Sequence, residues 1–362
     1  NRSITEAKIP SNIKIISSYA FSECIELTKI EIPDDSELQY IGESAFKNTK
    51  IKNIYFPKNL NELKNEWCRG IKYLVNIEIS PLNKNFVYLQ NKFLLGKSDQ
   101  KSDNFDILCF VRRDISEVEI PPCVTTISPS ALSESFYLKK VEFPGNLREI
   151  GKGAFFLTNI SMVYIPSSVT KIESYAFHSC SNLSSVEIPK NSELKSLGNW
   201  VFSGSQIKRI FLSKSLVELK KKCFCSAGML SAINVSPLNK NFIYKDNKFL
   251  LCKSSMNSGI FDVLLFVKPR AVGEMILPEQ VKIISDYSFY RCTKITKVTF
   301  PENSQIQAIG ENSFMESGIK EISIPPQVTQ IGAFAFATCA NLKVVKIPEN
   351  SQLQVLGDCV FL

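Results

Sequence analysis

The chain has 362 residues, of which 44% are hydrophobic, and its mean hydropathy is close to zero; this composition supports a continuous core and excludes a globally disordered protein. Lys and Arg exceed Asp and Glu by 43 to 35, a net charge of +8, and because no five basic residues cluster together we expect no nucleic-acid partner. No apolar run reaches the roughly 20 residues of a membrane-spanning helix, and no signal-peptide pattern opens the chain.

The first element along the chain is a phrase that then returns many times. IPSNIKIISSYAFSEC begins at Ile9, and close versions begin at Ile165, Leu277 and Ile324. Its opening step, an apolar residue followed by Pro or Ser, recurs every 22–24 residues except for two intervals of 41 and 42. The step falls at Pro10, Pro33, Pro57, Ser80, Pro121, Pro144, Pro166, Pro189, Ser213, Ser236, Pro278, Pro301, Pro325 and Pro348. This period predicts a repeat array of about 14 turns, here called rungs, with insertions after the fourth and the tenth.

One rung reads as a strand, a proline, a second short apolar spacing and an Ala-Phe pair. In LTKIEIP at 27–33, Ile30 and Ile32 alternate with charged residues, which indicates a half-buried strand that the proline ends. In the pair Ala176–Phe177, alanine fits where backbones crowd and phenylalanine fills the middle of the coil. We therefore expect a parallel β-sheet on one side of the array and short extended or helical turns on the other.

A single rung cannot fold alone. Its six or seven apolar side chains contribute about 1.5–3 kcal/mol each when buried, whereas ordering its backbone costs about 1–2 kcal/mol per residue. Stacked rungs share a continuous core and gain contacts with their neighbours. The sequence therefore predicts one solenoid over residues 1–362.

The two long intervals contain copies of one insertion. Residues 79–111 and 235–267 align without gaps with 21 of 33 positions identical, and the flanking rungs repeat at the same 156-residue offset. Each copy holds two apolar-alternating runs, FVYLQNKFLL and FDILCFV in the first, joined by a polar tip. The pattern predicts inserted β-hairpin flaps at about 81–115 and 237–271. The shared heptapeptide SPLNKNF is then the first turn of a structural flap.

These pieces together resemble a known family. The repeated phrase IPxxVxxIxxxAFxxCxxLxxIxIP resembles the BspA-like, Treponema-type leucine-rich repeats over essentially the whole chain. NELKNEWCRGIKYL at 61–74 and SPLNKNFVYLQNKFLLGKSD at 80–99 look most like the trichomonad branch of that family. The resemblance implies a leucine-rich-repeat solenoid that is a surface antigen, cell-surface or secreted, and that serves cell adhesion and host–parasite interaction.

Two function classes follow from this resemblance. The first is a non-enzymatic protein that binds a protein or glycan ligand, for example on a host surface or in the extracellular matrix. The alternative is a cytoplasmic leucine-rich-repeat scaffold or regulator of another protein. A signal peptide or membrane anchor in the full-length gene would separate the two classes.

No set of residues indicates catalysis, a cofactor or a metal. The single histidine, His178, is near Cys180, but that cysteine fills the small-residue position of its rung, so we interpret the histidine as a solvent-facing loop residue. Cys223 and Cys225 form only a CxC pair, which one histidine cannot complete as a zinc set. GKGAF at 151–155 lacks the rest of a phosphate-binding fingerprint. We expect no enzyme activity, no cofactor and no metal site.

The eleven cysteines also suggest buried thiols rather than disulfides. Cys24, Cys180, Cys292 and Cys339 share one repeat position, but none lies in adjacent rungs. Rungs stack at about 4.8 Å, so even a two-rung separation of about 10 Å exceeds the reach of a disulfide.

The candidate binding face follows from strand geometry. In each strand, the residue between the last two inward apolar side chains points outward, so successive rungs build a column. From the second rung to the ninth the column reads Glu31, Tyr55, Glu78, Glu119, Glu142, Tyr164, Glu187 and Phe211. One interpretation is a solvated surface on which Lys29 and Lys140 pair with the carboxylates. The other is a ligand face, where the aromatic residues anchor and the carboxylates select a basic or polyhydroxyl partner.

The ends of the chain carry no polar capping segment. It begins at Asn1 rather than Met and stops within a rung at Leu362, although solenoids usually need caps for solubility. We therefore expect either a processed or excised piece of a longer array or self-association through the uncapped ends.

Overall fold

The alternating pattern of each rung folds as a strand that its proline ends. In the computed structural model, which describes residues 2–255 and 257–362, Ile30 is buried and Lys29 is exposed, as the alternation predicts. A strand of this kind, here called a first strand, precedes each of the 14 predicted steps. The first strands are β1 (Glu6–Lys8), β3 (Lys29–Glu31), β5 (Asn53–Phe56), β7 (Asn76–Ile79), β11 (Glu117–Glu119), β13 (Lys140–Glu142), β15 (Met162–Tyr164), β17 (Ser185–Glu187), β19 (Arg209–Leu212), β21 (Ala232–Val235), β25 (Gly273–Ile276), β27 (Ile295–Thr299), β29 (Glu321–Ser323) and β31 (Val344–Lys346).

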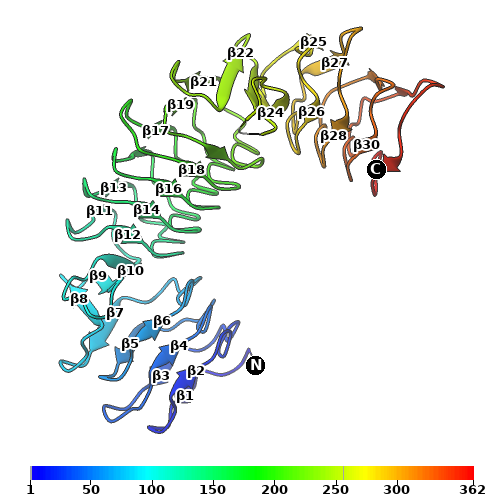
Figure 1. Ribbon diagram of the computed structural model, residues 1–362. Coiled ribbons are helices and arrows are strands. Elements are labelled where there is room, and N and C mark those ends of the chain that lie inside the picture. The colour runs from blue at the N-terminus through cyan, green and yellow to red at the C-terminus, as the bar shows by residue number, and fades with distance from the viewer. Residues whose placement is uncertain (1, 256) are drawn as a thin grey trace. The chain divides into compact units, whose positions relative to one another are not determined.

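The turns opposite the first strands are extended, and no helix occurs among the described residues. The second apolar spacing of each regular rung forms a strand of two residues, here called a second strand (Figure 1). These are β2 (Ile15–Ile16), β4 (Tyr40–Ile41), β6 (Glu62–Leu63), β12 (Thr126–Ile127), β14 (Glu149–Ile150), β16 (Lys171–Ile172), β18 (Ser196–Leu197), β20 (Glu218–Leu219), β26 (Ile283–Ile284), β28 (Ala308–Ile309), β30 (Gln330–Ile331) and β32 (Val355–Leu356). The predicted fold is confirmed as a β-solenoid of about 15 turns with parallel sheets.

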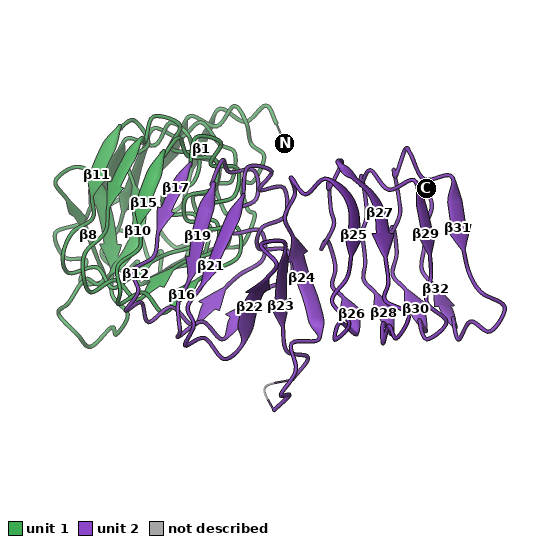
Figure 2. Cartoon of the chain, turned by 90° about the horizontal axis from the view of Figure 1, so that it is seen from above, with its two compact units in different colours: residues 1–183 green, residues 184–362 purple. Residues whose placement is uncertain are grey.

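The chain forms two compact units, unit 1 at residues 1–183 and unit 2 at residues 184–362 (Figure 2). Within each unit, neighbouring rungs pair in parallel and in register. In unit 1, for example, Lys8 of β1 lies opposite Glu31 of β3, and in unit 2 Ser323 of β29 lies opposite Lys346 of β31. Second strands pair in the same way, as in β2–β4–β6 of unit 1 and β26–β28–β30–β32 of unit 2.

After each regular second strand, the chain turns through the Ala-Phe pair; we call the five residues around the pair the corner. In the corner at 153–157, the amides of Gly153, Phe155 and Leu157 donate to carbonyls of the next corner, whereas the amides between them close turns within their own corner. The first and fifth residues are left-handed, with φ of 59° at Gly153 and 57° at Leu157. Left-handed backbone costs a non-glycine residue roughly 1–2 kcal/mol, and the hydrogen-bond ladder between corners offsets that cost.

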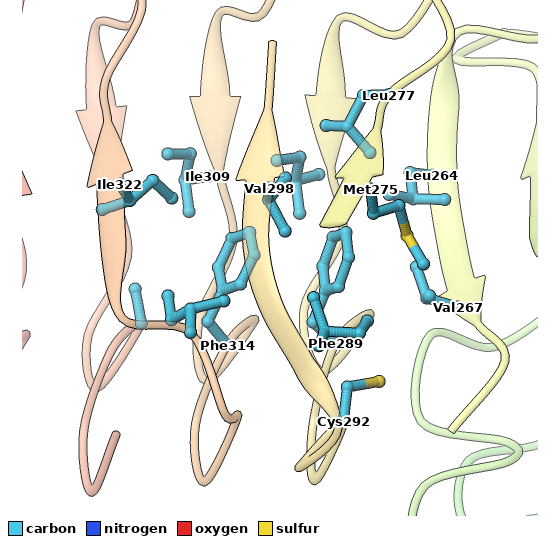
Figure 3. Packing of buried hydrophobic residues seen from close by; sticks show 14 of the residues in the cluster. Leu264, Val267, Met275, Leu277, Phe289, Cys292, Val298, Ile309, Phe314 and Ile322 are labelled. Carbon is cyan, nitrogen blue, oxygen red and sulfur yellow. The ribbon is translucent and has the colours of Figure 1, made fainter. Parts of the chain in front are cut away.

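The core is a column of inward side chains shared by successive rungs. In unit 2, the rings of Phe289 and Phe314 stack at 4.4 Å between centroids, and those of Phe314 and Phe336 stack at 5.1 Å. Figure 3 shows the first two rings side by side in adjacent rungs. In unit 1, Phe155 and Phe177 stack at 5.1 Å. The phenylalanine of the Ala-Phe pair is therefore a core residue that contacts the next rung.

Each flap adds a third strand to the predicted hairpin. In the first flap, β9 (Phe93–Gly96) and β10 (Ile107–Val111) are antiparallel and are joined by the polar tip. The run FVYLQNKFLL also divides, because Gln90 and Asn91, both with φ of 53°, form a two-residue turn between β8 (Phe86–Leu89) and β9. On its other edge β10 pairs in parallel with β12, so it serves as the second strand of the fourth rung.

The second flap repeats this arrangement in unit 2. Its strands are β22 (Phe242–Lys245), β23 (Phe249–Cys252) and β24 (Val263–Val267), and β24 pairs in parallel with β26. Asp246 and Asn247 form its two-residue turn. The polar tip KSSMNSG includes Met256, which lies outside the described residues.

The heptapeptide SPLNKNF fixes each flap to the preceding rung through one asparagine. The Asn83 side-chain amide donates to the carbonyls of Pro57 and Leu60 at 2.8 and 2.9 Å, and its Oδ1 accepts from the Phe86 amide at 3.0 Å. Asn239 makes the equivalent hydrogen bonds in the second flap. The repeated letters are therefore a structural anchor.

Replacing Phe336 by Ala is expected to destabilise unit 2 by about 3–5 kcal/mol, because this fully buried ring packs between Phe314 and Phe361. In a linear array the loss should loosen the adjacent rungs most. Hydrogen exchange read by mass spectrometry should therefore accelerate more at 310–317 than at 185–189.

The control for this substitution is Ile276→Ala. Ile276 is 69% exposed on β25, so the change in stability should stay within about 0.5 kcal/mol. Uniform acceleration of exchange along all rungs in the Phe336 variant would contradict the nearest-neighbour picture.

Candidate functional site

The eight residues of the predicted binding face all lie on first strands. Five of them are exposed, namely Glu78, Glu119, Glu142, Tyr164 and Glu187, whereas Glu31, Tyr55 and Phe211 are half-buried. Register places Tyr55 opposite Glu78 and Glu119 opposite Glu142. Beyond its pairing with β5, β7 packs against β8 of the first flap, and no pairing joins it to β11 among the described residues, so the first flap interrupts the column. Glu187 and Phe211 belong to unit 2.

Several carboxylates of this face are neutralised by lysines on the same or the adjacent strand. Glu31 forms ion pairs with Lys29 and with Lys8, the latter at 3.3 Å, and Glu142 pairs with Lys140 at 2.6 Å. Hydrogen bonds from Lys29 and Lys8 hold the pKa of Glu31 below its usual value. The local charge pairing that the sequence suggested is therefore present on this surface.

Tyr164 is the most open of the three aromatic residues on this face. Its side chain is 56% exposed, and Met162 on the same face of β15 is equally exposed, while Val163 between them is buried. Tyr55 is half-buried, and this burial raises its pKa. β15 thus carries an apolar pair, Met162 and Tyr164, which we call the β15 patch.

A second kind of site arises where each flap removes a corner. The fourth rung has a first strand, β7, and a second strand, β10, but the chain then runs directly to β11 without a corner. The third-rung corner at 66–70 and the fifth-rung corner at 130–134 therefore face each other across a gap, here called the first slot. The tenth rung of the chain, which lies in unit 2, also lacks a corner. The corners at 222–226 and 287–291 therefore face each other across a second gap, which we call the second slot.

Arg113 fills the deep part of the first slot. The residue is only 3% exposed, and its guanidinium donates to the carbonyls of Ala131 at 2.8 Å and Ser130 at 3.2 Å. It also lies 4.6 Å from the centroid of the Phe110 ring and 3.8 Å from the Cys68 sulfur. Burial raises the pKa of Cys68 to about 11, so this thiol stays neutral. The Ala131 carbonyl also accepts from the Val111 amide of β10 at 3.0 Å, so the arginine adds to a hydrogen bond that the flap strand makes with the fifth-rung corner.

A buried carboxylate closes the outer part of the first slot. Glu66 is 5% exposed and accepts from Arg69 and from Lys152, both at 2.9 Å. Because Lys152 comes from beyond the flap, this ion pair joins the two sides of the slot. The cavity that remains measures about 410 Å³, and His178 is part of its lining.

His178 is half-buried rather than solvent-facing, so that expectation is wrong. Its ring centroid lies 5.4 Å from that of Phe156 and 5.5 Å from that of Tyr175, and Nδ1 lies 2.8 Å from the Ser179 hydroxyl. Burial lowers the pKa of His178. Cys180 donates its thiol to the Phe155 carbonyl at 3.0 Å, and burial raises its pKa to about 11. A protonated thiol held this way is a poor nucleophile.

The second slot has the larger cavity of the two. Its cavity measures about 480 Å³, and an ion pair of 3.3 Å between Lys221 and Asp286 joins its two sides. The lining combines aromatic and cationic side chains, among them Phe224, Phe266, Tyr287, Tyr290, Arg270, Arg291 and Lys294.

Sequence reasoning missed both slots, although a signal for them was present. Trp67–Cys68 and Cys223–Phe224 replace the Ala-Phe pair before each flap, and no Ala-Phe pair follows FDILCFV or FDVLLFV. The number of corners is therefore smaller than the number of proline steps. Only the folded chain shows that the missing segments leave open space.

The described residues hold no group of three or more His, Cys, Asp or Glu side chains placed to bind a metal ion. In the same part of the chain, no helix has the length and apolar character needed to cross a membrane. All eleven cysteines are free thiols.

Comparison with known proteins identifies the family. The family described as BspA type leucine-rich repeat region matches residues 1–95, 104–252 and 265–362. The chain belongs to this family. The two internal segments outside the match, 96–103 and 253–264, contain most of the polar tip of each flap.

Solved structures show the same fold. A leucine-rich repeat protein from Eubacterium ventriosum is 20% identical, with a TM-score of 0.58, and the match covers 87% of this chain and 77% of that one. The pneumococcal vaccine antigen PcpA is 17% identical, with a TM-score of 0.61, over 98% of this chain and 68% of its own. No curated protein matches the chain.

Replacing Arg113 by Leu is expected to destabilise unit 1 by about 2–4 kcal/mol, because the hydrogen bonds from its buried, charged guanidinium to the Ser130 and Ala131 carbonyls are lost. Urea denaturation followed by circular dichroism measures this change. The adjacent Arg112→Leu is the matched control: Arg112 pairs near the surface with Asp114 at 2.6 Å, so its loss should cost at most about 1 kcal/mol. An equal loss of unfolding free energy in the two variants would contradict the structural role assigned to Arg113.

The stability of unit 1 is expected to fall as the pH is lowered from 7 to 5.5. The pKa of His178 is lower in the folded chain than in the unfolded one, so the unfolded chain binds the proton first and acid favours unfolding. Because this is the only histidine, His178→Phe should flatten the dependence of unfolding free energy on pH in that window. An unchanged slope in the variant would contradict the assignment.

Proposed function

We propose that the chain is a non-enzymatic binding protein, displayed at the cell surface or secreted, that recognises a protein or glycan through the first strands of unit 1. The β15 patch carries this proposal. Met162 and Tyr164 are each 56% exposed, and aromatic and methionine side chains are enriched in the centres of protein interfaces. A rigid solenoid holds them in place, so little conformational entropy is lost when a ligand covers them.

In this proposal, the charged residues around the patch determine which class of ligand it binds. Glu142 lies on the neighbouring strand β13 and is already paired with Lys140, so it supplies hydrogen-bond acceptors without strong net charge. A ligand with mixed polar and apolar surface, such as a folded protein or a glycan, suits this arrangement better than a highly charged polymer.

Family membership and the likeness to a pneumococcal vaccine antigen support surface display. The motifs at 61–74 and 80–99 support placement in the trichomonad branch, with a role in host–parasite adhesion. Protease shaving of intact source cells, followed by detection of the full-length protein, tests the location. Resistance to shaving in cells that remain intact would contradict surface display.

One observation favours a second candidate, an intracellular scaffold or regulator. All eleven cysteines are free, and proteins exposed to oxidising surroundings more often pair their thiols. In that case the same strand face would bind another intracellular protein.

The double variant Met162→Ala, Tyr164→Ala is expected to keep the fold and to lose binding by about tenfold or more, as when an interface anchor is truncated. The probes are laminin, fibronectin and a mammalian epithelial monolayer, each tested with the purified chain. Tyr137→Ala serves as the control, since Tyr137 is 67% exposed but lies outside the first strands. Undiminished binding by the folded double variant would place the binding surface elsewhere, and failure of the wild-type chain to bind any probe would contradict adhesion.

A further inference from the structure

The second slot carries a row of backbone donors that nothing in its own chain pairs. In the corner at 312–316, the amides of Phe314 and Glu316 donate to the next corner at 2.8 and 3.1 Å. The equivalent amides of the ninth-rung corner, those of Phe224 and Ser226, have no hydrogen-bond partner in the described part of the chain. They face the position that the missing tenth-rung corner would occupy. Alternate unpaired amides along the edge of a gap are a template for an added extended segment.

The duplicated flap shows how the two slots differ. The first slot also leaves the equivalent amides, those of Cys68 and Gly70, without a partner among the described residues, but Arg113 fills its deep part. In unit 2 the segment after the flap is one residue longer, and Pro269 aligns with Arg113, so the arginine that follows lies in the lining of the cavity and not in its deep part. Arg270 is exposed and contacts the Met229 sulfur at 2.7 Å, whereas Arg113 is buried in the first slot.

The charges around the second slot favour an anionic occupant. Arg270 and Lys294 both line the cavity and are exposed, and no carboxylate of the described residues pairs with either. Arg291 already binds Glu316 at 2.8 Å, which shows how a carboxylate in a neighbouring corner is held here. Cationic walls of this kind attract an acidic partner and disfavour a basic one.

The aromatic lining limits how deep an occupant can go. Phe266 of β24 packs against Phe224 at 5.7 Å between ring centroids and so occupies the core position that the missing corner would fill. An added segment therefore lies across the mouth of the slot and needs a small residue at its centre. Tyr290 also lines the cavity, and its ring can pack against an apolar side chain of the added segment.

We propose that the second slot binds an acidic, extended peptide segment of a partner protein, which completes the missing corner by pairing with the Phe224 and Ser226 amides and with Arg270 and Lys294. The site lies in unit 2 and is independent of the β15 patch in unit 1, so each of the two proposals can fail alone.

The chain itself supplies a suitable probe. Residues 310–317, GENSFMES, form a natural corner with two glutamates, and its Phe314→Ala version provides the small central residue that the slot requires. The fluorescein-labelled Phe314→Ala peptide is expected to bind the full chain in an anisotropy titration, and the unmodified peptide is expected to bind about tenfold more weakly. Hydrogen exchange should slow at 222–228 when the peptide binds, because the two amides become paired.

Matched charge reversals separate the slot from general attraction. Arg270→Glu with Lys294→Glu is expected to weaken peptide binding by about tenfold or more, since two charge-assisted contacts are lost. Lys84→Glu with Lys101→Glu changes the net charge by the same amount at exposed positions of unit 1 and should change affinity less than twofold. Met162→Ala with Tyr164→Ala should also leave peptide binding unchanged.

Four results would overturn the proposal. They are failure of both peptides to bind, equal loss in the two charge-reversal variants, unchanged exchange at 222–228 in the peptide complex, and binding of a heparin oligosaccharide but not of the peptides. The last result would mean that the cations of the slot serve a sulfated glycan instead.

Discussion

Pairing between successive corners is the constraint on which the rest of this structure depends. Most corners hold two left-handed residues, and most of these are not glycine. The alternate amides of a corner can be satisfied only by the carbonyls of the next rung. A rung by itself would leave those donors open and its phenylalanine exposed. Stacking removes both penalties together, which explains why a small or apolar residue followed by phenylalanine recurs at most corners. It also explains why the loss of one corner has consequences on both sides of it.

The two flaps show how a solenoid accommodates an insertion without losing its core. The third flap strand, β10 or β24, continues as the second strand of its rung, and its Phe110 or Phe266 occupies the place of the absent corner phenylalanine. The sheet and the core therefore continue past the insertion, while the corner side opens. Each flap therefore takes the place of one corner, and a slot remains where that corner would lie.

Duplication then allowed the two slots to diverge. In unit 1, Arg113 pairs with the carbonyls on the far side of the gap, and Glu66 with Lys152 closes its mouth. In unit 2, Pro269 aligns with Arg113 and Arg270 lies exposed in the lining of the cavity, so the cations and the unpaired backbone donors of this slot remain available. The first-strand surface follows a different rule. Lysines pair with two of its carboxylates, Glu31 and Glu142, and its exposed side chains are glutamates together with the apolar pair of the β15 patch.

The sequence by itself determined the repeat, its period, the first strands and the position of the flaps, because these depend on local alternation, on proline and on a copied segment. It also determined that Phe336 and its equivalents are core residues, since one rung has too few apolar side chains to fold without them. It did not reveal the Gln90–Asn91 turn, whose letters are a weaker hairpin signal than Asn-Gly. The burial of His178 and Arg113 and the open amides of Phe224 and Ser226 were decided only by tertiary structure. Each of these depends on which segments become neighbours across a missing corner, and residues far apart in the chain meet there only after the rungs have stacked.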